Sequence, residues 1–159
     1  ESAGSTVFRE PRDLCLGPDG TWIIADATVG TLFAIRDGGS SVEPIDVPLS
    51  DVATVTADDR YVYAGGESGV VRIAWPDGTP EIIDDRSTDG LHTAAGVLWG
   101  TNSDWGVFEV SGNLRLALPD LRRPGRMTGS DPLLVTDTAA GEVWAVSLSD
   151  LDALDSEQR

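Results

Sequence analysis

Four stretches of the sequence repeat one pattern without a gap: a strand-like run, a short turn and a second, alternating run. They are WIIADATVGTLFAI (22–35), YVYAGGESGVVRIA (61–74), LWGTNSDWGVFEVS (98–111) and LLVTDTAAGEVWAV (133–146). The stretches align on their turn glycines, which are Gly30, Gly69, Gly106 and Gly141, spaced by 39, 37 and 35 residues. A regular period of this length is typical of repeat architectures and constrains the fold more than any other feature of the chain.

Each repeat predicts a unit of four short antiparallel strands. The glycine favours a hairpin turn with positive φ, and the first run is nearly all apolar, as in a strand covered on both faces. The second run alternates, which predicts one apolar face made of Leu32 and Ala34, Val71 and Ile73, Phe108 and Val110, or Val143 and Ala145. Further strands fit before the hairpin, such as RDLCL (12–16), and after it, such as SVEPID (41–46). Four strands in about 38 residues are typical of a propeller blade.

The sequence therefore predicts an all-β fold, a β-propeller of four blades. The units fall near 11–46, 47–84, 85–120 and 121–147. The fourth unit lacks an outer strand, and we expect residues 5–10 to supply it and close the ring, because closure removes two free sheet edges. Residues 148–159 are expected to form a polar C-terminal tail.

Two alternatives to closure within the chain stay open. In the first, the four blades are half of a larger ring that a second copy completes, which makes a homodimer one of the expected partners. In the second, they are part of a longer propeller, because the chain starts at Glu1 and not at a methionine. We expect the chain to belong to a larger bacterial protein, and the sequence leaves its compartment open.

The composition argues against two classes of partner, nucleic acids and membranes. The 159 residues include 27 acidic and 11 basic side chains, and the formal net charge is −16. Such a surface repels phosphate backbones, so we expect no nucleic-acid partner. No apolar run approaches the roughly 20 residues that a membrane span needs, so we expect no membrane insertion.

The single cysteine, Cys15, has no cation or histidine near it in sequence and is expected to be a structural thiol.

The first and fourth hairpins carry a family resemblance. IIADATVGTLFAI and LLVTDTAAGEVWAV resemble blades of the NHL, strictosidine-synthase-like and gluconolactonase-like propellers, which read apolar run, Asp-Thr or Asp-Ser, glycine and alternating run. The resemblance covers residues 5–147 as a repeat style, and the second and third units depart from it at Gly65-Gly66 and Asn102-Ser103. It implies a propeller and transfers no activity. Enzymes of the group, as the resemblance implies, hold a metal at the central channel with Glu, Asn and Asp side chains, or use a catalytic histidine.

Asp26, Asn102 and Asp137 stand at the start of three of the turns. Short Asx side chains there bond their own backbone and nucleate the turn, which is the favoured role. The same three residues are the candidates for a metal site. No loop has the alternating acidic spacing that assembles a calcium cage, so we expect no cofactor, with Ca²⁺ or another divalent cation as the alternative.

The candidate binding residues lie between and beside the later repeats. LRRPGR places Arg122, Arg123 and Arg126 together in an acidic chain, and arginine is enriched at interface hot spots; a solvated loop is the alternative. Trp105 lies at the tip of a turn, where it is a candidate for an exposed aromatic contact. His92, the one histidine, has no carboxylate at a recognisable spacing, so a structural or binding role is favoured and no catalytic residue is assigned.

These observations favour a non-catalytic recognition or sensor module that presents propeller loops to a protein or a small-molecule ligand. The alternative is a metal-dependent lactonase or lyase of the propeller type, which requires Asp26, His92, Asn102 and Asp137 to converge on one channel. A third hypothesis is an assembly element that completes a propeller ring by self-association.

Overall fold

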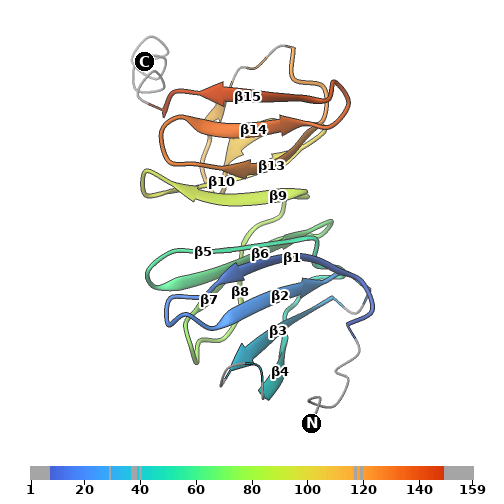
Figure 1. Cartoon of the computed structure of the whole chain (residues 1–159), viewed down its shortest axis with the longest axis vertical. Coiled ribbons are helices and arrows are strands. Elements are labelled where there is room, and N and C mark those ends of the chain that lie inside the picture. Colours follow the sequence, from blue (N-terminus) through green and yellow to red (C-terminus); the bar gives the residue numbers. More distant parts are fainter. Residues whose placement is uncertain are drawn as a thin grey trace. The chain divides into compact units, whose positions relative to one another are not determined.

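The computed structural model describes residues 8–28, 30–36, 39, 41–116, 118 and 120–148 (Figure 1). These residues form fifteen strands in four antiparallel sheets. They are the sheets of a four-blade β-propeller, which confirms the predicted fold class. The chain divides into two compact units, Glu1–Thr88 and Asp89–Arg159. Among the described residues, no helix is long and apolar enough to cross a membrane.

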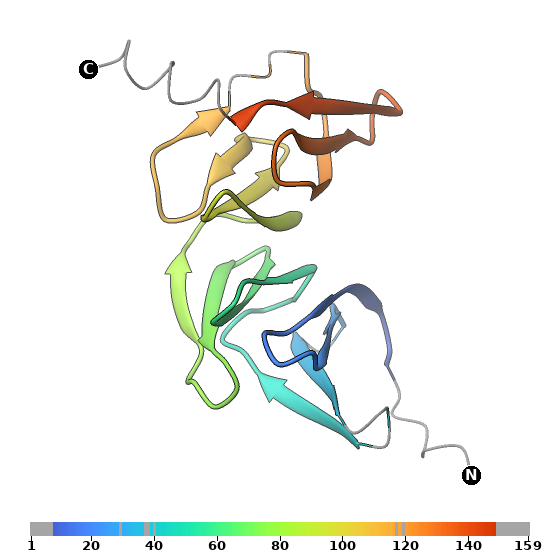
Figure 2. The ribbon, with the colours of Figure 1, turned by 60° about the vertical axis from the view of Figure 1, so that its left-hand side comes forward.

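The first unit holds the first and second blades, whose strands follow chain order (Figures 1 and 2). The first blade consists of β1 (Pro11–Leu16), β2 (Trp22–Asp26), β3 (Thr31–Arg36) and β4 (Ser41–Asp46). The second blade consists of β5 (Thr54–Ala57), β6 (Tyr61–Gly66), β7 (Gly69–Ala74) and β8 (Glu81–Asp84). β1 lies beside β5. Asp13 joins them, because its Oδ2 accepts hydrogen bonds from Oγ1 of Thr54 (2.8 Å) and from N of Val55 (2.9 Å).

The second unit holds the third and fourth blades. The third consists of β9 (Gly90–Ala94), β10 (Val97–Asn102), β11 (Gly106–Glu109) and the short β12 (Arg115–Leu116). The fourth consists of β13 (Pro124–Thr128), β14 (Leu133–Asp137) and β15 (Glu142–Val146). β13 lies beside β9 and β10. Here a hydroxyl joins the blades, because Oγ1 of Thr101 donates to the carbonyl of Gly125 at 2.7 Å.

In each unit the two blades bury one face against each other. The core of the first unit includes Ile23, Ala25, Leu32 and Ala34 of the first blade and Val62, Ala64, Val71 and Ile73 of the second. The core of the second unit includes Trp99, Val107 and Leu116 of the third blade and Met127, Leu133 and Val135 of the fourth. Full burial of one aliphatic side chain is worth about 1.5–3 kcal/mol, so these facing sheets are what stabilises each unit.

The four hairpins form where the repeat predicts them. The strands pair antiparallel as β2–β3, β6–β7, β10–β11 and β14–β15. The aligned glycines all have positive φ, with values of 58° at Gly30, 130° at Gly69, 73° at Gly106 and 72° at Gly141. The predicted reason for glycine at this position is therefore confirmed, since other residues resist that conformation.

The third hairpin departs from the common register. Thr101 pairs with Val107, whereas the matching residue of the first blade, Ala25, pairs with Leu32, one position further from the turn glycine. The turn of the third hairpin comprises residues 103–105, one residue fewer than the turn at 27–30. Val107 and Phe108 are both buried.

The predicted apolar face of the second run is buried in the first three blades but not in the fourth. Val143 is 65% exposed, Ala145 is also exposed, and Trp144 between them packs against the core. In the first blade Leu32 and Ala34 lie in the core of the first unit, whereas in the fourth blade Leu133, Val135 and Trp144 of the opposite face pack in the core of the second unit.

The prediction that the first run is covered on both faces holds for β6 but is wrong for β2 and β14. From Val62 onwards every residue of β6 is buried. In β2, Trp22 is 46% exposed and Ile24 is half-buried. In β14, Leu134 is half-buried between two buried neighbours. An apolar run therefore marks the strand without showing how many of its faces are covered.

The predicted closing strand and tail fall largely outside the described residues. Of the strand at 5–10, only residues 8–10 are described, and they form no strand. Phe8 instead packs edge-on against Phe33 of β3, with ring centroids 5.3 Å apart. Of the tail at 148–159, only Leu148 is described. Ring closure by the N-terminal segment therefore stays a prediction.

Substitution of Gly69 is expected to be more damaging than substitution of another positive-φ glycine in the same unit. A Cβ at Gly69 would collide with the carbonyl oxygen of Asp84, whereas a Cβ at Gly20 has no atom within 4 Å. Gly20→Ala is therefore expected to cost about 1 kcal/mol of backbone strain, and Gly69→Ala about 1–3 kcal/mol more for the collision. Urea denaturation of both variants checks this, and equal losses would contradict the close approach.

Candidate functional site

Buried Asx side chains hold three of the hairpin turns. Oδ1 of Asp26 accepts from N of Thr28 (3.2 Å), Oδ1 of Asn102 from N of Asp104 (3.0 Å) and Oδ1 of Asp137 from N of Ala139 (2.9 Å). The three side chains belong to residues that are at most 4% exposed. Their predicted role in nucleating turns is confirmed. Among the described residues, no group of three or more His, Cys, Asp or Glu side chains could hold a metal ion.

The second hairpin has Gly65 where the others have an Asx residue. Its acceptor comes from another loop, because Oδ1 of Asp51 accepts from N of Glu67 at 2.7 Å. Glu67 follows Gly65 by two positions, as Thr28 follows Asp26. The turn therefore keeps an acceptor at the same place although the repeat has lost the side chain.

The backbone of the LRRPGR segment is bound to Asp137 of the fourth blade. Asp137 accepts from the backbone N of Arg122 at Oδ2 (2.8 Å) and from that of Arg123 at Oδ1 (3.3 Å). The first blade has the same arrangement, in which Asp26 accepts from N of Arg9 (2.7 Å) and N of Glu10 (3.2 Å). In both blades the pair of residues precedes a proline that starts the first strand. This repeated Arg-Glu-Pro and Arg-Arg-Pro signal was available in the sequence and was missed.

These bonds favour the charged form of Asp137. The hydrogen bond from N of Arg122 lowers the pKa of Asp137 below its ordinary value of 3.8, and those from N of Ala140, Ala139 and Arg123 add to this, against the opposing effect of burial. The buried carboxylate of Asp137 thus fixes the backbone of Arg122 and Arg123. Both arginine side chains are exposed.

A pocket of about 460 Å³ opens beside Trp105 in the second unit. We call it the Trp–Arg pocket; its lining residues are Ser103, Trp105, Gly106, Arg115, Leu116, Leu118 and Leu121. It joins the tip of the β10–β11 turn to β12 and to the segment that leads into the fourth blade. The structure therefore brings Trp105 close to the start of LRRPGR, since Leu121 directly precedes Arg122.

Asn102 fixes Trp105 at the mouth of this pocket. Its Oδ1 accepts from the backbone N of Trp105 at 2.6 Å, and the residue stays 46% exposed. Arg115 lies over the indole with Cζ 5.9 Å from the ring centroid, and its Nη2 donates to the carbonyl of Asp104 at 3.2 Å. Among the described residues, Arg115 makes no ion pair with a carboxylate. The sequence reasoning missed Arg115, whose only signal was a lone cation in an apolar strand.

The remaining sequence candidates lie elsewhere. His92 is half-buried on β9, and its Nε2 is 2.7 Å from the carbonyl oxygen of Gly129. Arg126 is exposed on β13 and does not line the Trp–Arg pocket. Cys15 is packed against the first core, where burial, with a smaller effect of Asp13, raises the pKa of the thiol to about 12. A thiol of this kind is inert at neutral pH.

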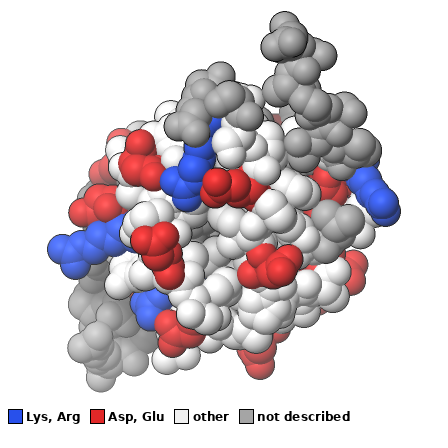
Figure 3. All heavy atoms as spheres, turned by 90° about the horizontal axis from the view of Figure 1, so that it is seen from below, with Lys and Arg blue, Asp and Glu red and all other residues white. Residues whose placement is uncertain are grey.

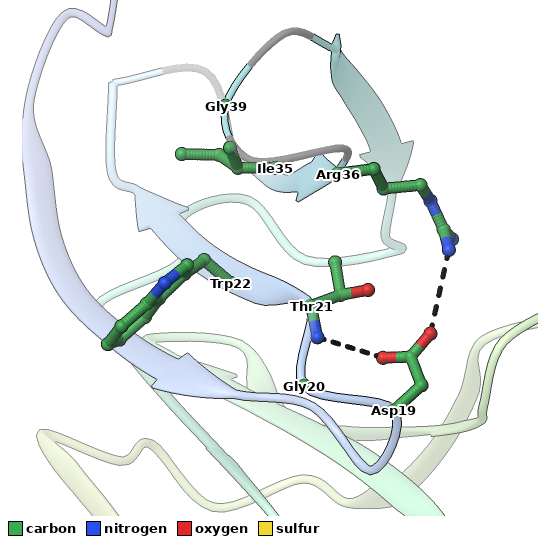
Figure 4. A pocket seen from close by; sticks show the side chains of 7 residues that line it. All are labelled: Asp19, Gly20, Thr21, Trp22, Ile35, Arg36 and Gly39. Atoms are coloured by element: carbon green, nitrogen blue, oxygen red, sulfur yellow. Dashed lines mark hydrogen bonds and ion pairs between the residues drawn. The ribbon is translucent and has the colours of Figure 1, made fainter.

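A second pocket, of about 560 Å³, lies in the first unit between the β1–β2 and β3–β4 turns (Figure 4). Trp22 lines it, and Arg36 faces Asp19 across it with Nη1 and Oδ2 3.6 Å apart. Arg36 also bonds Glu43 through Nε at 3.2 Å. Its cation is therefore neutralised by two carboxylates of the protein, unlike that of Arg115.

The surface charge agrees with the composition. On the face shown in Figure 3, acidic side chains are scattered among a few arginines, and the described atoms there form no continuous basic area. A nucleic-acid backbone needs such an area, so this face offers none for it.

The four sheets place the chain among β-propeller proteins. Similar solved structures are virginiamycin B lyase from Staphylococcus aureus (16% identity, TM-score 0.61, 87% of this chain and 55% of that one) and the WD40 repeats of RRP9 (12%, 0.61, 86% and 50%). The computationally designed protein Ika4 is also similar (14%, 0.62, 89% and 95%). The chain spans about half the length of the lyase and WD40 structures. No protein-family model and no curated protein matches it.

These similarities show the fold alone. The general prediction of a propeller is confirmed, whereas the narrower resemblance to the NHL, strictosidine-synthase-like and gluconolactonase-like group is not. The similar structures include both a lyase and WD40 repeats. Function must therefore be argued from the site and not from the fold.

Asp137→Asn is expected to destabilise the protein at neutral pH and to weaken its acid dependence. Because the folded-state pKa is lowered, the carboxylate contributes stability above its unfolded pKa and loses it as the pH falls through the folded value. The gap between wild type and variant should therefore be larger at pH 7 than at pH 3. Urea denaturation at both values measures it, with Glu142→Gln at the neighbouring exposed carboxylate as the control. An equal gap at both values would rule out this role of Asp137.

Proposed function

We propose that the protein is a recognition module that binds a partner protein through the Trp–Arg pocket. The observation that carries the proposal is Trp105. Asn102 accepts a hydrogen bond from its backbone N, the residue is 46% exposed, and it lies beside Arg115, which has no carboxylate partner among the described residues. A rigid, exposed indole is a costly feature for a monomer and a common anchor at interfaces.

The lining determines which chemistry the pocket accepts. Three leucines and the indole offer an apolar surface, and Arg115 offers planar donors that fit a carboxylate. Arg122 and Arg123 follow directly on Leu121 and extend the positive charge beyond the rim. The pocket therefore suits a partner segment in which an apolar side chain stands next to Asp or Glu.

The acidic surface shapes this interaction. With a net charge of −16 the protein as a whole repels an acidic partner at long range. Recognition of a carboxylate by Arg115 then acts only at short range, where the cation and the donor geometry dominate. This arrangement selects for the correct contact and against non-specific attraction.

The described residues that line the pocket include no His, Asp, Glu or Cys side chain that could act as an acid or a base. His92 lies outside the pocket, with its Nε2 beside a backbone carbonyl. Membership of the NHL and gluconolactonase-like group, a sensor role and a place in a larger bacterial protein belong to the same proposal, and none of them changes the chemistry of the pocket.

The test starts from a displayed library of random peptides selected on the full chain. We expect the enriched peptides to combine an apolar residue with an adjacent Asp or Glu. Trp105→Ala and Arg115→Ala should weaken a selected peptide by about 30-fold, the effect of a hot-spot contact of about 2 kcal/mol. Fluorescence polarisation measures the affinities.

Trp22→Ala is the matched control, because Trp22 and Trp105 are both 46% exposed and lie in different units. It should leave peptide binding unchanged. Circular dichroism verifies that each variant is folded. Peptides that bind equally well to Trp105→Ala, or a consensus without an acidic residue, would refute the proposal.

A further inference from the structure

The first blade exposes one large apolar face. Leu14 pairs with Ile24 and Ile24 with Phe33, while Leu16 pairs with Trp22 and Trp22 with Ile35. Cross-strand partners share a face, so these six side chains form one surface, which we call the outer face of the first blade. Leu14 is 58% exposed, Leu16 52% and Trp22 46%. Phe8 packs edge-on against Phe33 at one side of this face.

The fourth blade exposes a smaller face. Leu134 pairs with Ala145, and Thr136 pairs with Val143. We call these four side chains the outer face of the fourth blade. Val143 is 65% exposed, Ala145 is exposed, and the other two are half-buried. The opposite face of the same blade is packed in the core of the second unit.

Within each unit the protein covers such a face with another blade. The inner face of the first blade, which includes Ile23 and Leu32, is fully buried against the second blade. Leu133 and Val135 of the fourth blade are equally buried against the third. The two outer faces have the same apolar character but are left partly in solvent.

We propose that the outer face of the first blade binds the outer face of the fourth blade of a second copy of this chain. The two surfaces are complementary in size, because the first carries Trp, Phe, Ile and Leu side chains and the second carries mainly smaller ones, Ala, Val and Thr beside one Leu. The chain also spans only about half of the lyase and WD40 propellers that it resembles. A second copy supplies the missing half, and two-fold symmetry makes the contact twice.

The expected interface is large enough for a stable dimer. With strands about 4.8 Å apart and about 3.3 Å per residue, the four-stranded first blade covers about 320 Å² and the three-stranded fourth blade about 240 Å². Two contacts between such faces then bury about 1,100 Å², above the roughly 1,000 Å² that a biological interface needs. This inference is independent of the Trp–Arg pocket, whose residues belong to neither face.

Salt should strengthen the association. The ten side chains of the two faces are uncharged, whereas two copies of a chain with a net charge of −16 repel each other. Added salt screens that repulsion and leaves the apolar contact in place. A dimer held by ion pairs would respond in the opposite direction.

The first experiment measures mass by light scattering and affinity by sedimentation at 50 and 500 mM NaCl. We expect a dimer that is tighter at the higher salt concentration. Leu14→Glu and Val143→Glu should each raise the dimer dissociation constant at least 100-fold. Ile82→Glu is the matched control, because Ile82 is 54% exposed on β8 and lies on neither face, so the dimer should persist. Circular dichroism verifies folding.

The second experiment distinguishes contact between copies from contact within one chain. Leu14→Cys and Val143→Cys are made as separate proteins, mixed and oxidised. We expect a covalent heterodimer, which neither variant should form when it is oxidised alone. In the double variant Leu14→Cys/Val143→Cys, a disulfide that forms within a monomer would overturn the proposal. So would a wild-type monomer at 500 mM salt, or a dimer that tolerates both glutamate variants.

Discussion

The fold depends on buried oxygen acceptors at the ends of the middle strands. The turns leave backbone N–H groups without a partner in the sheet, and the buried Asx side chains accept from them in part-buried hydrogen bonds. Asp26 and Asp137 accept hydrogen bonds both from turn N–H groups and from N–H groups of the segment that precedes the first strand of the blade. Turn, middle strand and entry segment are thereby fixed as one piece. In the second blade Asp51 of another loop accepts the hydrogen bond from the turn. The turn therefore needs an acceptor at this place, but the acceptor does not have to come from the same position in the repeat.

The same interactions display the residues that we assign to binding. Asn102 closes a turn and in doing so fixes the backbone of Trp105. Asp137 closes another and fixes the backbone of Arg122 and Arg123. Their side chains are free to face solvent because the backbone beneath them is held by the fold. A lyase and WD40 repeats share this fold, and what differs between propellers is the side chains that such fixed turns carry.

Local patterns predicted much of the fold and little of the site. The hairpins, the positive φ at Gly30 and the turn role of Asp26 followed from residues close in sequence. The pairing of Thr101 with Val107 did not, because a turn shortened by one residue leaves the glycine alignment unchanged. Trp105 was found from its position at a turn, whereas Arg115 was missed because only the folded chain brings it over the indole.

The sequence by itself determined the strands, the turns and the four-blade class of fold, because these rest on contacts between residues a few positions apart. The tertiary structure alone decided which face of each blade is buried. Leu32 and Val143 occupy the same position in the repeat, yet one is fully buried and the other is 65% exposed. Burial depends on the blade that packs against the face, and that neighbour lies tens of residues away in the chain. The local repeat pattern therefore does not predict which face is buried.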